Sequence, residues 1–150
     1  MEQPSAFEKF ELSISEEIKG YLKETASWAY FLAIVGFVGL ALLLIFGLFF
    51  GAIISSMPTD PYSELGIGTG FIGFIYVILA VIYFFPILYL YKFAKKMKNA
   101  LSSNNNSELT ESFSNLKSHY KFVGIFTAVI LSLYLLIFLL GLFAAGAAAF

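Results

Sequence analysis

The sequence predicts an all-α integral membrane protein, in which three transmembrane helices continue as helices into the cytoplasm. Only 13% of its 150 residues are charged, whereas an ordinary soluble domain carries about 25%. Three stretches, 25–59, 65–91 and 122–150, contain no Asp, Glu, Lys, Arg or His. One crossing needs about 20 apolar residues, and a charge at its centre costs roughly 2.5 to 3.5 kcal/mol to insert. Each stretch therefore predicts one crossing, within a single membrane domain that covers residues 1–150.

The first element is a helix over residues 13–57, preceded by a loosely ordered tail over 1–12. Ser13 is followed three residues later by Glu16, which is the spacing of a capping box at a helix start. Prolines follow soon after residue 57 and end the segment. An acidic region precedes the apolar run, which is too long for a signal-peptide core, so we expect a retained helix.

The second element is a helix over residues 66–101 whose last turns form an amphipathic extension beyond the membrane. Pro86 lies inside the span and predicts a kink near Ile82, because proline removes a backbone hydrogen bond. The extension carries an apolar stripe made of Phe93, Met97 and Leu101.

The third element is a helix over residues 107–146, separated from the second by three asparagines. Its first turns carry an apolar stripe at helical spacing, made of Leu109, Phe113, Leu116 and Tyr120. If the two stripes face each other, about ten residues of helix form a hairpin that projects roughly 15 Å. The N-terminal helix is expected to dock on this hairpin.

The lysines predict the orientation of the chain. All of them precede the first span or lie between the second and third: Lys9, Lys19, Lys23, Lys92, Lys95, Lys96, Lys98, Lys117 and Lys121. With three spans these two regions share a side, and loops rich in lysine stay in the cytoplasm. The N-terminus and the loop between the second and third spans are therefore expected inside, and the C-terminus outside.

Small residues in the outer half of the membrane predict close helix packing, because they let backbones approach each other. The candidates are Gly47, Gly51, Gly66, Gly70, Gly73, Gly141 and Ala145. Packing within one chain and packing between protomers both remain open.

Four lysines cluster directly after the second span: Lys92, Lys95, Lys96 and Lys98. Each lysine near an anionic membrane surface contributes about 1 kcal/mol to binding. The cluster predicts contact with lipid head groups or with an acidic partner. The alternative is that it only sets the topology.

No arrangement of residues predicts a catalytic, cofactor-binding or metal site. Gly68, Gly70 and Gly73 spell a dinucleotide fingerprint, but no predicted strand precedes them and no acidic residue follows about 20 positions later. His119 is the one histidine and has no predicted partner nearby. The chain lacks cysteine and its spans carry only isolated hydroxyls, so we do not expect an enzyme. The net charge of -1 argues against nucleic-acid binding.

The runs 16–25 (EEIKGYLKET), 91–98 (YKFAKKMK) and 109–113 (LTESF) resemble a small bacterial membrane-protein family classed as a domain of unknown function. This resemblance covers most of the chain. It implies a bacterial source and hence the inner membrane, because outer-membrane spans are barrels. It implies no activity.

Two function classes follow. The first is a non-catalytic interaction, scaffold or accessory subunit, self-associating or part of a larger membrane complex, as the glycine faces and the projecting hairpin indicate. The alternative is a small oligomeric channel or transporter lined by hydroxyl groups, those of Tyr76, Tyr83, Thr127 and Tyr134. The absence of ionisable residues from the spans, tyrosines apart, argues against an ion or proton pathway. The lipid bilayer is the expected partner, and no small-molecule substrate is identified.

Overall fold

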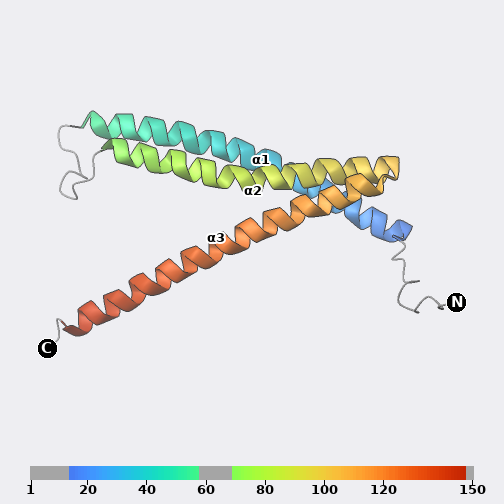
Figure 1. Cartoon of the computed structure of the whole chain (residues 1–150). Coiled ribbons are helices and arrows are strands. Elements are labelled where there is room, and N and C mark those ends of the chain that lie inside the picture. The colour runs from blue at the N-terminus through green and yellow to red at the C-terminus, as the bar shows by residue number, and fades with distance from the viewer. Residues whose placement is uncertain (1–13, 58–68, 148–150) are drawn as a thin grey trace.

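The computed structural model describes residues 14–57 and 69–147, which form three α-helices and, within these ranges, no strand (Figure 1). They are α1 (Glu16–Ser55), α2 (Thr69–Ser103) and α3 (Asn106–Ala147). Each is long and apolar enough to cross a membrane, by length and composition. The predicted all-helical architecture is confirmed.

The start of α1 is fixed by Ser15. Its side chain accepts a hydrogen bond of 3.3 Å from the backbone N–H of Ile18, and Glu16 and Glu17 occupy the first turn. Both features stabilise a helix N-terminus, because they satisfy a free N–H group and oppose the positive end of the dipole. Ser13, the predicted capping residue, lies outside the described residues, as do the tail and the loop that joins α1 to α2.

The turn between α2 and α3 explains how two long helices reverse direction within two residues. Asn104 adopts a left-handed backbone conformation with φ of 49°, which asparagine tolerates better than most residues. The N–H of Asn105 then donates to the carbonyl of Ala100 at 3.1 Å, closing α2 in the manner of a Schellman motif. The Asn105 side chain also accepts from the N–H of Ser107 at 2.9 Å and so caps α3. The predicted break is confirmed, and α3 begins one residue earlier than expected.

Helices α1 and α2 form a closed pair along a seam of small residues. Most of the positions of α1 that are withdrawn from the surface form one series with alternating spacings of three and four, as in a coiled coil: Leu22, Ala26, Ala29, Ala33, Gly36, Leu40, Leu43, Gly47, Phe50 and Ile54. A Cβ atom on Gly36 would lie 3.0 Å from Ile87, and one on Gly47 would lie 2.5 Å from the Cβ of Tyr76. The missing side chains therefore permit the two backbones to approach.

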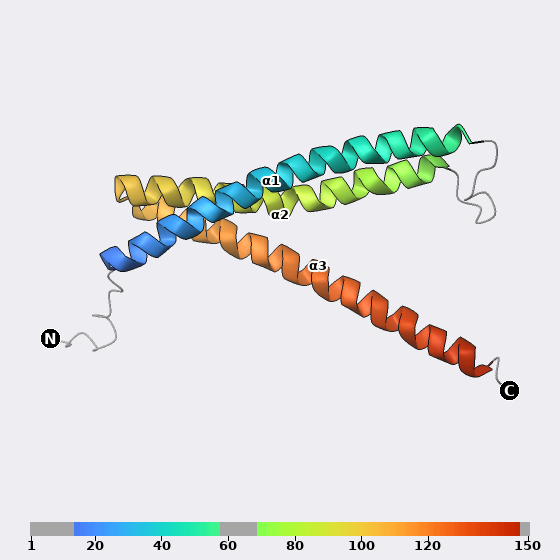
Figure 2. The same ribbon diagram turned by 180° about the vertical axis from the view of Figure 1, so that it is seen from behind.

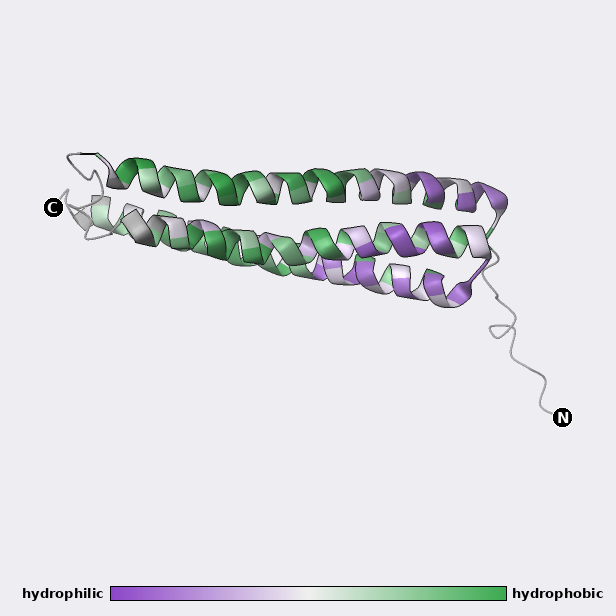
Figure 3. Ribbon diagram, turned by 90° about the horizontal axis from the view of Figure 1, so that it is seen from above, coloured by the Kyte–Doolittle hydropathy of each residue, from purple (hydrophilic) through white to green (hydrophobic). Residues whose placement is uncertain are grey.

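Helix α3 behaves differently from this pair. Among the described residues α2 lies against both neighbours, whereas no Cα atom of α1 comes within 8 Å of one in α3. Figures 1 and 2 show α3 packed against α2 near their common turn and then diverging from the α1–α2 pair toward its C-terminal end. Polar residues gather at one end of all three helices, where α1 begins and α2 turns into α3 (Figure 3). We refer to this as the polar end.

Candidate functional site

The three helices meet in one small core at the polar end, which we call the three-helix cluster. Its buried side chains are Ala26, Ala29, Phe93, Ala94 and Met97, with Phe93 only 1% exposed. Partly buried apolar side chains from all three helices surround them: Leu22, Tyr30, Leu90, Leu101, Leu109 and Leu116. The start of α1 thus docks on the α2–α3 hairpin, as expected.

The inward stripe of α3 is not the one predicted from apolar spacing. Phe113 and Tyr120 are 44% and 66% exposed, whereas Ser112 is fully buried. The Ser112 hydroxyl donates to the Leu109 carbonyl at 2.7 Å, so it needs no partner from α2, and its oxygen lies 4.0 Å from the Met97 sulfur. A small residue lets Met97 fill this position. The prediction was therefore wrong for the two aromatic residues. The space beside Met97 requires a small side chain, whereas the spacing pattern selects residues only by their apolar character.

His119 joins α3 to the middle of α2. Its Nδ1 atom lies 2.8 Å from the carbonyl oxygen of Pro86. A carbonyl only accepts, so this nitrogen carries the proton and donates. Helix α2 remains helical through Pro86. The sequence did not predict this contact. The one indication of it was the position of His119, a polar ring only three residues before a long apolar stretch.

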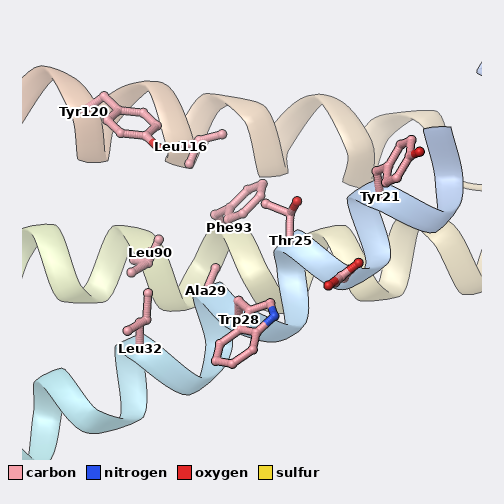
Figure 4. A pocket seen from close by; sticks show the side chains of 10 residues that line it. Tyr21, Thr25, Trp28, Ala29, Leu32, Leu90, Phe93, Leu116 and Tyr120 are labelled. Carbon is pink, nitrogen blue, oxygen red and sulfur yellow. The ribbon is translucent and has the colours of Figure 1, made fainter.

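A groove of about 370 Å³ lies between α1 and α3, beside the three-helix cluster (Figure 4). Leu32 and Leu90 point toward one another across its apolar end, and Leu116 and Tyr120 border it from α3. Glu24 and Thr25 supply its polar lining from α1.

A second cavity, of about 500 Å³, lies between α2 and α3, and we call it the lysine pocket. Its lining combines an apolar edge with charged and amide side chains: Leu88, Tyr91, Lys92, Lys95, Lys96, Asn99, Glu108, Glu111 and Asn115. Lys96 forms an ion pair with Glu111 and lies 3.5 Å from Glu108. Lys96 lies after the charge-free stretch 65–91 in the sequence. The hydrogen bond to Glu111 raises the pKa of Lys96 above its usual value, although partial desolvation opposes this.

The four predicted lysines divide into three environments. Lys96 is held by the two glutamates of α3. The Lys98 ammonium lies over the ring of Tyr30 on α1, 4.7 Å from its centroid, in a cation–π contact. Lys92 and Lys95 line the lysine pocket and have no ion pair within the described parts of the chain. Two lysines thus tie the helices together, and two remain available.

The small residues predicted to pack closely also differ in their surroundings. Gly47 lies against Tyr76, and a Cβ atom on Gly73 would lie 4.0 Å from the Gly47 carbonyl oxygen, so both belong to the α1–α2 seam. Gly51 is half-buried on α1. A Cβ atom on Gly141 would meet no atom of a neighbouring helix within 4 Å. Of the remaining candidates, Gly70 and Ala145 lie within α2 and α3, and Gly66 is outside the described residues.

The predicted hydroxyl seam is not assembled within the described chain. Tyr76 packs against α1 at Gly47, whereas the Tyr83 ring contacts Phe126 of α3 with centroids 5.5 Å apart. Thr127 is exposed, and Tyr134 is 68% exposed on the part of α3 that has left the pair. Within residues 14–57 and 69–147, no three His, Asp or Glu side chains gather as a metal site.

Residues 131–144 of α3 form what we call the free half of α3. Every side chain in this range is exposed, including Leu133, Ile137 and Leu140. Ile130, directly before this range, is half-buried. An apolar surface about 14 residues long therefore faces outward from α3, in contrast to the seam that closes α1 on α2.

Residues 67–142 match the model of a protein family described as a family of unknown function (DUF5362). The match covers half of the chain and includes α2, the lysine pocket and most of α3. No curated protein and no solved structure matches this chain.

Proposed function

The chain belongs to DUF5362, a family of unknown function, and from its own geometry we propose that it is a three-span membrane protein that acts as a non-catalytic interaction, scaffold or accessory subunit. The proposed location is the bacterial inner membrane, with the polar end in the cytoplasm. The lysine distribution supports this orientation, because all nine basic residues fall on one side of three spans.

The observation that carries the proposal is the free half of α3. Helices α1 and α2 bury their small residues against each other, whereas residues 131–144 have no contact of this kind. Helix association in lipid depends on close van der Waals packing, and small residues permit it. Gly141 offers such an approach, since nothing lies within 4 Å of the position where its Cβ would be. We propose that the free half of α3 receives a transmembrane helix from a partner, while the other two helices and the three-helix cluster hold it in place.

Photo-cross-linking in native membranes tests this proposal. Because the sequence contains no cysteine, an introduced cysteine is the one thiol of the chain that the reagent can label. A thiol-reactive benzophenone is attached to single cysteines at Leu133, Ile137 or Leu140. Matched controls are placed at Val38, Leu42 and Ile45 of α1, which are likewise exposed and apolar. We expect protein adducts at the α3 sites, recurring every three or four positions, and mainly lipid adducts at the α1 sites. Equal protein adduct yields from α1 and α3 would contradict the proposal.

A further inference from the structure

We propose that the lysine pocket between α2 and α3 binds the phosphate head group of an anionic phospholipid. This site is separate from the free half of α3 and does not depend on it. The pocket, its charges and its position along the span each support this assignment.

The charge within the pocket is unevenly matched. Three lysines and two glutamates line it, and both glutamates are directed to Lys96. Lys92 and Lys95 are left without a carboxylate within the described residues. A phosphate diester carries one negative charge, so it can neutralise the remaining positive charge of the site. The ammonium groups of Lys92 and Lys95 are the expected donors.

The pocket walls are held in place before a ligand arrives. The contacts of Lys96 with Glu108 and Glu111 connect α2 to α3 directly across the pocket. The Asn115 side chain donates to the Glu111 carbonyl at 2.8 Å and is therefore also fixed on α3. The two glutamates repel an anion from the Lys96 side, which directs a phosphate toward Lys92 and Lys95.

The position of the pocket favours a lipid over a phosphate from solution. Leu88 and Tyr91 belong to the charge-free stretch that ends at residue 91, and Lys92 is the first charged residue after it. The pocket therefore crosses the level at which the apolar span gives way to charge. A phospholipid placed there sets its phosphate beside the lysines and its acyl chain along Leu88. Lysines at this level attract anionic lipids at about 1 kcal/mol each.

The test is native mass spectrometry of the full chain in detergent, titrated with phosphatidylglycerol or phosphatidylcholine. The test variant is Lys92→Gln with Lys95→Gln. The matched control is Lys117→Gln with Lys121→Gln, which removes the same charge from exposed positions of α3 outside the pocket. We expect the chain to retain phosphatidylglycerol in preference to phosphatidylcholine. The test variant should bind phosphatidylglycerol roughly 25-fold more weakly, because each lost lysine costs about 1 kcal/mol, or about fivefold in affinity, and the two factors multiply. The control variant should bind it nearly as well as the original chain does.

Three outcomes would overturn the proposal. One is equal loss of phosphatidylglycerol from the test and control variants, which would indicate general attraction to lysine. Another is equal retention of phosphatidylcholine. The third is displacement of the lipid by millimolar inorganic phosphate, which would identify a soluble anion as the ligand. Helix content and thermal unfolding by circular dichroism establish that both variants are folded.

Discussion

At the scale of single residues, the absence of a side chain decides where α1 and α2 meet. Gly36 and Gly47 lie opposite Ile87 and Tyr76, at distances that leave little room for a Cβ atom. The sequence singled out Gly47 because small residues permit close helix approach. The same reasoning singled out Gly141, where an added Cβ atom would meet no atom of another helix within 4 Å. A small residue in an apolar helix therefore indicates where close packing is possible. It does not indicate which helix packs there, because that depends on which face of the helix is turned inward.

Gly47→Ala should weaken the α1–α2 pair, because the new Cβ would lie 2.5 Å from the Cβ of Tyr76 and force one helix to shift. Overpacking of this kind costs about 1 to 3 kcal/mol. The matched control is Gly39→Ala, since nothing lies within 4 Å of that position. Thermal unfolding in a mild detergent, followed by circular dichroism, measures both. A variant at Gly47 that is as stable as the one at Gly39 would show that the seam is looser than described.

At the scale of elements, α3 consists of two parts with different surroundings. Its first part is attached to α2 through Leu109, Ser112 and Leu116, and through ion pairs to Lys96. His119 adds a hydrogen bond to Pro86, above which aromatic contacts to Phe122 and Phe126 complete the attachment. The sequence predicted correctly that Leu109 and Leu116 pack inward, but the other half of the predicted α3 stripe, Phe113 and Tyr120, is exposed. It did not predict the inward positions of Ser112 and His119, because neither residue contributes to an apolar periodicity. The Ser112 hydroxyl is bonded within its own helix, and the His119 ring is bonded to a carbonyl far away in the sequence.

His119→Ala should loosen the attachment of α3 to α2, whereas His119→Asn, whose amide can donate from a similar position, should retain much of it. Hydrogen bonds between membrane helices average about 0.6 kcal/mol and reach about 1.7 kcal/mol. The two unfolding free energies in detergent should differ by an amount in this range. Equal stability of the two variants would mean that the hydrogen bond to Pro86 contributes no measurable stability.

At the scale of the whole molecule, the sequence predicted the number, extent and helical nature of the elements. Long charge-free stretches leave few alternatives, because backbone groups in lipid must be bonded within a helix or a closed barrel, and continuous apolar stretches of this length fit a helix. The relation between the helices was much harder to predict. Residues that face lipid and residues that face another helix are both apolar in a membrane, so periodicity does not distinguish the exposed Leu133 from the half-buried Leu43. The divergence of α3 therefore emerged only from the structure.

Distances between spin labels in a lipid bilayer test this divergence most directly. One label is placed at Phe49 of α1 and a second at either Phe74 of α2 or Leu140 of α3, all of which are exposed and lie away from the polar end. We expect a short, narrow distance distribution between α1 and α2 and a clearly longer one between α1 and α3. Equally short distances for both pairs would show a closed three-helix bundle, and the partner surface proposed on α3 would not exist.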